Sequence, residues 1–423
     1  MSEWKEKTLK DLVEVDPEQL PSSTDADFSF FYIDISSVSL GNVSFPIHSI
    51  QYKDAPSRAR KILKDNDILM STVRPNLKAF AQFKKRSKSN FIASTGFAVL
   101  RSRPNVEIGF IYHSLFSNEV ETQIEALVVG SNYPAINSGD VRNLKINIPL
   151  FPIQQKIAHI LTTCDTVIEQ TQSAIAKNKA IKQGMLHDLF TCGLDTNGHL
   201  RPSYHDAPEL YKESELGMIP KEWEVKRFGD FVHLIHGFQF RDYDFTENGI
   251  PIVKIGQIKP ENVDLSNCSF ISKNRIDEFR SIIIRNGDVL MALTGATLGK
   301  ACQVKKLKND VLQNYRVGRF EPKNLDEIHK GFLYYTLTTR QFLNQVFSKV
   351  NAGAQGNIGK SDFEKPLFKM PDINEQRRIF DRLESLNHKL ESEETLLQKY
   401  QSIKRGLMGD LLGGKKEVCN IRQ

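Results

Sequence analysis

The sequence predicts an α+β fold in which two mostly β domains are each followed by one long helix. Three observations lead to this prediction. The chain contains an internal repeat about half its own length. Each copy carries short runs of β-branched and aromatic residues, which are typical of strands, and ends in a segment of heptad periodicity. We expect the two helices to pack as an antiparallel coiled coil, which relates the halves by pseudo-two-fold symmetry.

The repeat is clearest at two similar segments, AIKQGMLHDLF at residues 180–190 and SIKRGLMGDLL at residues 402–412. The identical pairs, each separated by 222 positions, are Ile181 and Ile403, Lys182 and Lys404, Gly184 and Gly406, Asp188 and Asp410, and Leu189 and Leu411. The offset slips to 219 positions at Trp4 and Trp223, the two tryptophans of the chain. A drifting offset is what small loop insertions leave behind, so the pattern indicates a duplication.

Length and composition are those of a folded, multidomain protein. The chain has 423 residues, of which 40% are hydrophobic and 26% charged, so two to four domains are expected. It has no long apolar run and begins with a charged segment, so we predict neither a membrane helix nor a signal peptide. The five cysteines form no CxxC pair, which favours a reducing, cytoplasmic location. A net charge of +6 permits a polyanionic partner without requiring one.

The β regions and the helices are separated within each copy. Residues 28–100 and 249–320 contain runs such as FSFFYIDI and SIIIRNGDVLMAL, broken by Gly, Pro, Asn and Asp, and predict twisted, mostly antiparallel sheets. Short helices are expected near residues 109–126 and 331–348. The predicted boundaries are residues 1–150 for the first β domain, 151–192 for the first helix, 193–220 for a linker, 221–372 for the second β domain, 373–414 for the second helix and 415–423 for a tail.

The apolar seam of each helix follows alternating steps of four and three residues. The predicted seam residues are Ile157, Leu161, Ile168, Ile175, Met185 and Leu189 in the first helix, and Ile379, Leu383, Leu386, Leu390, Leu397, Leu407 and Leu411 in the second. Some 38 residues make a helix of roughly 57 Å. Chain order places the second β domain at the far end of the first helix, so the second helix can return along it. Two independent domains with unpaired helices are the alternative, but such exposed seams would aggregate or need partners.

Catalytic motifs are not found. GAQGNIGKS at residues 353–361 has one residue too many for a phosphate-binding loop. No Pro-Pro dipeptide of an amino-methyltransferase is present, and no GxGxxG follows a strand. His233 and His236 have no neighbouring Cys or carboxylate to complete a metal set. We therefore predict a chain that is not an enzyme and holds no metal or cofactor.

Basic and polar loops at matched places in the two copies are the candidates for binding. Arg and Lys neutralise phosphates, and Asn, Gln, Arg and Tyr can reach base edges. The candidate DNA-binding residues are Arg74, Asn76, Lys78, Lys84, Lys85, Arg86, Lys88, Ser131, Asn132 and Tyr133 in the first copy, and Lys300, Lys305, Lys306, Lys308, Gln355, Asn357 and Lys360 in the second. For any one lysine a solvated surface role is the simpler interpretation. Two different readers on a rigid spacer would suit a split, asymmetric DNA site.

Three segments resemble a known family. LGMIP at residues 216–220 with Trp223 is similar to the entry of a target-recognition domain in Type I restriction–modification specificity (S) subunits. MPDINEQRRI before the second helix and SIKRGLMGDLL at its end are similar to further elements of that family. The resemblance covers nearly the whole chain. One departure is Ile153, which stands in the first copy where the second has Glu375, so partner contacts at the two helix starts need not be identical.

The resemblance implies a non-catalytic subunit of a prokaryotic, cytoplasmic complex. It would choose the bipartite DNA sequence that two methyltransferase (M) subunits methylate with S-adenosylmethionine, and restriction (R) subunits using ATP and Mg would join for cleavage. The helices would act as a spacer and as the docking surface for the M subunits. The alternative is a structural coiled-coil adaptor that joins protein partners without sequence-specific DNA binding.

Overall fold

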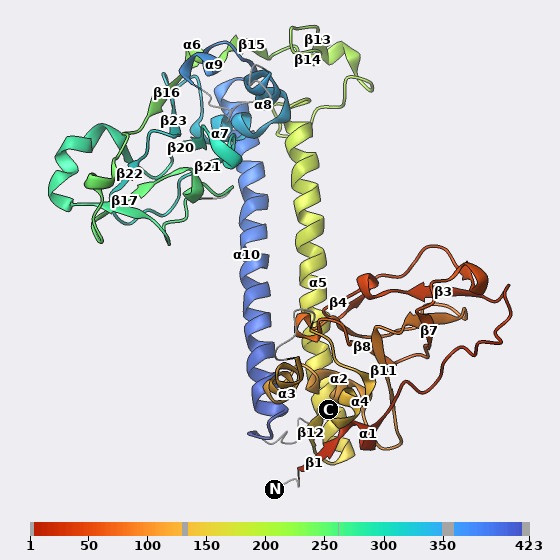
Figure 1. The fold of residues 1–423 in the computed structure, drawn as a ribbon. Helices are drawn as coiled ribbons and strands as arrows, with labels where there is room; N and C mark the ends of the chain where they lie inside the picture. Colours follow the sequence, from red (N-terminus) through yellow and green to blue (C-terminus); the bar gives the residue numbers. More distant parts are fainter. Residues whose placement is uncertain (1–3, 129–133, 261, 349–358, 417–423) are drawn as a thin grey trace. The chain divides into compact units, whose positions relative to one another are not determined.

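The computed structural model describes residues 4–128, 134–260, 262–348 and 359–416 (Figure 1). The chain forms two compact units that are not consecutive segments. The first unit consists of Met1–Ala174 with Glu393–Gln423, and the second of Ile175–Ser392. Each unit contains one β domain and parts of two long helices, α5 (Phe151–Leu189) and α10 (Ile373–Leu411). The predicted fold class, two mostly β domains each followed by a long helix, is confirmed.

The first unit is built on two four-stranded sheets, with strand orders β6-β3-β10-β7 and β2-β11-β8-β9. Their strands are β2 (Val13–Val15), β3 (Ser29–Ile33), β6 (Ile50–Gln51), β7 (Ala59–Ile62), β8 (Ile68–Ser71), β9 (Phe80–Gln82), β10 (Phe91–Ser94) and β11 (Phe97–Ser102). The smaller pairs are β1 (Lys5–Thr8) with β12 (Lys145–Ile148), and β4 (Val38–Ser39) with β5 (Asn42–Val43). The short helices are α1 (Leu9–Leu12), α2 (Ile108–Ser114), α3 (Asn118–Val128) and α4 (Ser138–Asn143).

The second unit repeats this arrangement with strand orders β18-β17-β22-β19 and β16-β23-β20-β21. Its strands are β16 (Val232–His236), β17 (Ile250–Val253), β18 (Ser269–Ile271), β19 (Ile283–Ile284), β20 (Val289–Ala292), β21 (Ala301–Gln303), β22 (Val311–Gln313) and β23 (Val317–Pro322). The smaller pairs are β15 (Glu224–Arg227) with β24 (Leu367–Met370), and β13 (Tyr211–Lys212) with β14 (Ile219–Pro220). The short helices are α6 (Phe228–Phe231), α7 (Lys330–Thr338), α8 (Arg340–Phe347) and α9 (Lys360–Glu364).

Strand pairing preserves the duplication in detail. In each unit one pair of central strands is parallel, β3 with β10 and β17 with β22. The other described pairings in these sheets are antiparallel. Both units have the same strand order and the same single parallel pair, which indicates that one β architecture was duplicated. Loop sequences changed while the frame did not.

The two long helices run antiparallel within each unit. In the first unit Ile157 and Leu161, near the start of α5, share a core with Leu411 at the end of α10. In the second unit Leu189, at the end of α5, shares a core with Ile379 near the start of α10. Each unit therefore needs a helix end from the other half of the sequence to complete its core. The antiparallel packing predicted from chain order is confirmed.

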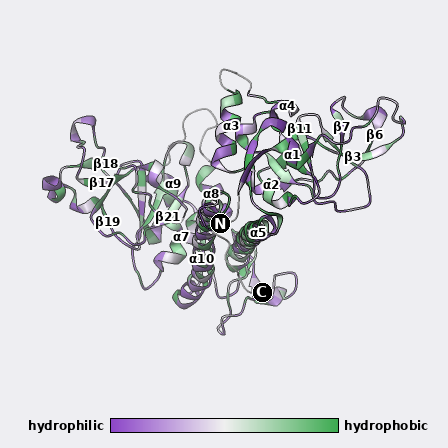
Figure 2. Cartoon of the chain, turned by 90° about the horizontal axis from the view of Figure 1, so that it is seen from below, coloured by the Kyte–Doolittle hydropathy of each residue, from purple (hydrophilic) through white to green (hydrophobic). Residues whose placement is uncertain are grey.

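The predicted seam residues are the inward residues of these helices. Ile157, Leu161, Ile175, Leu189, Ile379, Leu383, Leu390 and Leu411 are buried, and Ile168, Met185, Leu386, Leu397 and Leu407 are half-buried. Figure 2 shows hydrophobic and hydrophilic residues interleaved along α5 and α10, as expected for helices that bury one face. Burial of such a stripe is the main source of helix stability in proteins.

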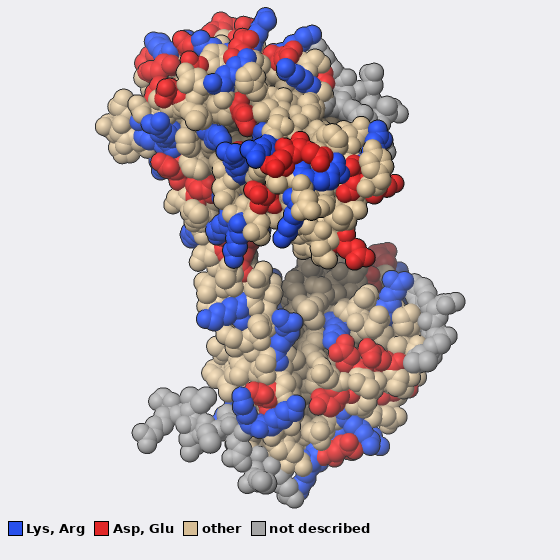
Figure 3. Space-filling model, turned by 90° about the vertical axis from the view of Figure 1, so that its left-hand side faces the viewer, with Lys and Arg blue, Asp and Glu red and all other residues tan. Residues whose placement is uncertain are grey.

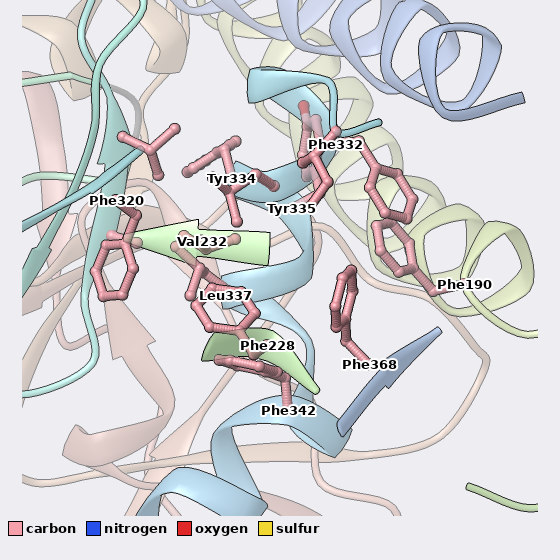
Figure 4. Close-up of a cluster of buried hydrophobic side chains, with 14 of the residues drawn as sticks. Phe190, Phe228, Val232, Phe320, Phe332, Tyr334, Tyr335, Leu337, Phe342 and Phe368 are labelled. Atoms are coloured by element: carbon pink, nitrogen blue, oxygen red, sulfur yellow. The ribbon is translucent and has the colours of Figure 1, made fainter. Parts of the chain in front are cut away.

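Aromatic side chains join the end of α5 to the second β domain. Phe190, directly after α5, stacks on Phe332 of α7, with ring centroids 5.0 Å apart and an interplanar angle of 8°. Figure 4 shows this pair beside Phe368, with Phe228 and Phe342 lower in the same cluster. The helix end is therefore packed into the domain core and does not merely lie on its surface.

A buried ion pair fixes the linker on the start of α10. Arg201 donates two hydrogen bonds to Glu375, of 2.6 and 3.1 Å, and the backbone N–H of Leu194 donates a third of 2.7 Å. The Glu375 side chain is only 1% exposed. Gly193, with φ of +67°, brings the chain so close to Trp223 that a Cβ there would lie 2.4 Å from its ring. The first copy has Ile153 at the equivalent position and lacks this clamp.

Equivalent positions of the two long helices carry polar side chains with different chemistry in the two units. In the first unit Lys404 of α10 pairs with Asp165 of α5. The buried His113 lies beside this pair, 3.8 Å from the Asp165 carboxylate and 3.2 Å from the Thr162 hydroxyl. The position equivalent to Asp165 in the second unit is Asn387, whose amide donates to the Tyr335 hydroxyl at 2.6 Å. Polar groups in an apolar helix interface specify register.

The buried histidine makes the first unit sensitive to acid. Burial, with the Lys404 ammonium nearby, lowers the pKa of His113 to about 3, whereas an unfolded histidine has a pKa near 6.5. The unfolded chain binds the extra proton, so stability is complete above pH ~6.5 and falls as pH decreases towards 3. At pH 5 the expected loss is about 2 kcal/mol.

This effect is measurable as a difference between variants. His113→Gln should reduce by about 2 kcal/mol the change in unfolding free energy between pH 7 and pH 5, measured by urea denaturation. His199→Gln is the matched control, because the His199 side chain is 80% exposed. An equal pH dependence in the wild type and His113→Gln would contradict the assignment.

Candidate nucleic-acid interface

The predicted basic residues occupy two opposite ends of each β domain. In the first unit β8 and β9 are antiparallel, with Met70 opposite Phe80 and Ile68 opposite Gln82. Residues 72–79, which join these strands, therefore lie at one end, and Lys84 and its basic neighbours at the other. The second unit has the same division, with residues 293–300 between β20 and β21 and Lys305 beyond β21. We call the end that carries residues 72–79 or 293–300 the hairpin end.

The hairpin end of the first unit is formed by two loop segments held side by side. The Arg74 N–H donates to the Pro134 carbonyl at 2.7 Å, and the Ile136 N–H donates to the Thr72 carbonyl at 2.9 Å. Val73 and Ala135 form a β-bridge between these hydrogen bonds. The structure therefore places Arg74, Asn76 and Lys78 beside the segment that follows residues 131–133. The candidates Ser131, Asn132 and Tyr133, like Gln355 and Asn357 in the second copy, lie outside the described residues.

The backbone of residues 74–78 adopts an uncommon conformation. Arg74 and Lys78 have φ of +48° and +52° on either side of the single turn Pro75–Leu77. Non-glycine residues in this left-handed region cost of order 1 kcal/mol and cluster at functional sites. Arg74, Asn76 and Leu77 are exposed at this turn, whereas Lys78 pairs with Glu121 at 2.8 Å. The turn presents a cation, an amide and an apolar side chain to solvent.

The second unit builds its hairpin end with other residues. Gly295 and Gly299 have φ of +75° and +80°, and a Cβ on Gly299 would lie 2.5 Å from the Phe347 ring. Lys300 is exposed after them. The Leu293 N–H donates to the Arg316 carbonyl at 2.9 Å, which places residues 314–316 at the same end. The two units thus share loop positions but not loop chemistry.

Aromatic side chains of the second unit were not among the sequence candidates. Phe238 is 44% exposed and Tyr243 is 87% exposed. Tyr315 accepts a hydrogen bond from the Arg316 guanidinium at 2.7 Å, and Phe238 forms a β-bridge with Asn314. The available signal was the spacing of four aromatic residues among polar ones, with Arg241, in HGFQFRDYDF, because aromatics with cations are typical of nucleic-acid surfaces.

Some of the basic residues at the opposite ends have partners within the chain. Lys84 donates to Asn66 at 2.6 Å, and the Arg86 guanidinium lies 4.4 Å from the centroid of the Phe45 ring. In the second unit Lys305 pairs with Glu384 of α10 at 2.7 Å. Lys85, Lys88, Lys306 and Lys308 are exposed at these ends, and Lys360 is exposed at the start of α9. The structure thus separates residues that the sequence grouped together.

Charge on one face of the molecule is mixed. On the face drawn in Figure 3, Lys and Arg are interspersed with Asp and Glu and form no single basic patch. Recognition by such a surface depends more on particular side chains than on bulk charge. Within the described parts of the chain, no group of three or more His, Cys, Asp and Glu residues is arranged to hold a metal ion. No helix among those described is long and apolar enough to cross a membrane.

Both halves of the chain match one family model, described as the Type I restriction modification DNA specificity domain, over residues 1–179 and 220–401. The chain is similar to the MjaVIII specificity subunit of Methanocaldococcus jannaschii, with 25% identity over 363 residues that cover 85% of this chain and 81% of that protein. It is also similar to the HindI specificity subunit of Haemophilus influenzae, with 29% identity over 329 residues, covering 64% and 68% of the two chains.

The fold has a relative among solved structures. The S subunit of a Type I restriction–modification system from M. genitalium aligns with a TM-score of 0.60 at 16% identity, over 97% of this chain and 96% of its own. At this identity the likeness concerns the fold. Since the family model matches most of both repeats, the chain belongs to the family of Type I restriction–modification specificity subunits.

Proposed function

We propose that this chain is the non-catalytic subunit that reads a bipartite, asymmetric DNA site and directs methylation and restriction by partner subunits. The observation that carries the proposal is the pair of hairpin ends, which occupy equivalent positions in a duplicated frame but expose different residues. Equivalent placement favours two readers of the same kind. Different side chains, Arg74 and Asn76 in one and Lys300 in the other, favour two different half-sites.

The chemistry of the reaction would belong to the partners. S-adenosylmethionine would be bound by the M subunits, and ATP with Mg by the R subunits. This chain would position each M subunit near the base that the M subunit methylates. Family membership favours this role over that of a structural adaptor joining protein partners.

Two hollows at equivalent places support docking of two copies of one partner. In the second unit a groove of about 740 Å³ lies between the last turns of α5, the start of α8 and β24. In the first unit a smaller hollow of about 330 Å³ lies at positions 222 residues away, where Ser117 corresponds to Thr339 and Leu412 to Phe190. A duplicated chain that binds two identical subunits must present its docking surface twice.

The bipartite reading predicts a specific methylation pattern. The chain, co-purified with the M subunits of its own system, should methylate genomic DNA at one two-part sequence with unlike halves, as read by single-molecule sequencing. M subunits without this chain should give no such pattern. Methylation without sequence preference would refute the proposal.

Lys300 and Lys305 lie at opposite ends of the second β domain, so we expect only Lys300 to contribute to DNA binding. Lys300→Ala at the hairpin end should lower the slope of log affinity against log salt by about 1, since one phosphate contact is lost. Lys305→Ala is the matched control and should leave the slope unchanged, because Lys305 is held by Glu384. Titration of duplex DNA at several salt concentrations measures both, and equal effects would contradict the division.

The groove in the second unit predicts an effect at Gly184, where the structure has open space for a side chain. No atom lies within 4 Å of a Cβ built there, and glycine destabilises a helix interior. Gly184→Trp should therefore fold normally yet weaken binding of an M subunit about tenfold or more, measured by calorimetric titration. Ile181→Trp is the control, on the same helix but outside the groove. Unaltered binding by Gly184→Trp would exclude this surface.

A further inference from the structure

A buried carboxylate lies beneath the two loop segments of the first hairpin end. Asp16 follows β2 directly and has φ of +56°, which Asp tolerates better than most residues. Its Oδ1 accepts from the Val99 N–H of β11 at 2.9 Å. Its Oδ2 accepts from the Ser138 hydroxyl of α4 at 2.5 Å and pairs with Lys61 of β7 at 2.8 Å. One side chain therefore joins both sheets and α4.

Asp16 and its partner Lys61 are both buried, and Lys61 makes a second hydrogen bond within the chain. The Lys61 and Asp16 side chains are 6% and 7% exposed, and Lys61 also donates to the Phe97 carbonyl. Buried ion pairs are costly to desolvate and often give no net stability over an apolar replacement. The pair therefore calls for an explanation other than fold stability.

The second unit shows that the fold does not need this charge. Val15 lies opposite Leu100, and Leu234 lies opposite Phe320, in the matching sheets. Register therefore places Ile235 where the first unit has Asp16. The residue 222 positions after Ser138 is Lys360, which has no hydroxyl to donate in this way. The same frame forms with an apolar residue, so the polar cluster serves something particular to the first unit.

The cluster of Asp16, Lys61 and Ser138 anchors the start of α4, which directly follows the loop segment at residues 134–136. Asn137 caps α4, accepting from Gly139 at 2.7 Å and Asp140 at 3.0 Å, so the helix start is rigid. Ser138 ties this start to Asp16. Two residues earlier, the Ile136 N–H donates to the Thr72 carbonyl, and Thr72 is tied to the Gly96 carbonyl by its own N–H and hydroxyl at 2.9 and 2.8 Å. The loop pair is thus anchored at two points.

We propose that the Asp16–Ser138 hydrogen bond, buttressed by Lys61, is a positioning latch that sets the loops at residues 72–78 and 134–136 for reading one half-site. Asp16 does not itself meet DNA. It acts by removing freedom from the segment that carries Arg74 and Asn76, and base discrimination depends on such preorganisation. This inference rests on the proposed function, because it names a residue set that supports the reading surface.

The latch is tested first on the chain itself, by hydrogen exchange with mass spectrometry. Ser138→Ala removes only the hydroxyl and leaves the Lys61–Asp16 pair in place. Exchange at the Arg74 and Ile136 amides should accelerate about tenfold while the second unit stays unchanged. Ser138→Thr should restore the wild-type rate. Ser102→Ala is the matched control, since Ser102 donates to the Val106 carbonyl at 2.5 Å away from these loops. Unchanged exchange in Ser138→Ala overturns the latch.

The second measurement uses the complex with its M subunits and compares methylation of the cognate site with single-base variants of each half. Ser138→Ala and Asp16→Asn should lower discrimination about tenfold in one half-site only, with the other half-site unaffected. Equal loss in both halves, or none, overturns a positioning role. If exchange accelerates as expected but the wild-type complex has no sequence preference, the latch stands and the proposed function fails.

Discussion

The apolar seam between the two long helices is the interaction on which both units depend. Ile157 and Leu161 are covered by the end of α10, and Ile379 and Leu383 lie in one core with the end of α5. Each unit thus takes a structural element from the opposite half of the sequence. Removing one helix end would expose part of the core of a domain more than 200 positions away in the chain, because apolar surface that loses its cover returns to water. Each compact unit therefore contains residues from both halves of the sequence.

The two units have the same arrangement of strands but different side chains at equivalent positions. Asp165 with Lys404 and His113 stands where the other unit has Asn387 with Tyr335. Both sets place buried polar groups among apolar side chains, and such groups can define how the packed elements align. The hairpin ends follow the same rule. The Pro75–Leu77 turn, flanked by Arg74 and Lys78 with positive φ, corresponds to a turn with Gly295 and Gly299 at positive φ in the other unit. The loop sequence changes while the anchoring strands do not.

The structure brings some of the sequence candidates together and separates others. Arg74, Asn76 and Lys78 lie beside the segment after Tyr133, because hydrogen bonds join residues 72–74 to residues 134–136. Lys84 and Lys305 follow the same hairpins and looked similar in the sequence, but an antiparallel strand carries them to the other end of the domain, where Asn66 and Glu384 bind them. Phe238 and Tyr243 were missed because the aromatic spacing in HGFQFRDYDF does not show which of its side chains are exposed; the structure shows that these two are.

The sequence by itself determined the duplication, the two heptad helices, the β character of each domain and the resemblance to a family, since these are properties of local periodicity and of comparison along the chain. Only the tertiary structure decided which residues share a surface. Asp16, Lys61 and Ser138 are unremarkable in the sequence and up to 122 positions apart, yet they meet in one hydrogen-bonded cluster. Long-range pairing of strands brings them together, and that pairing is set by the burial of the whole core and by no short segment of the chain.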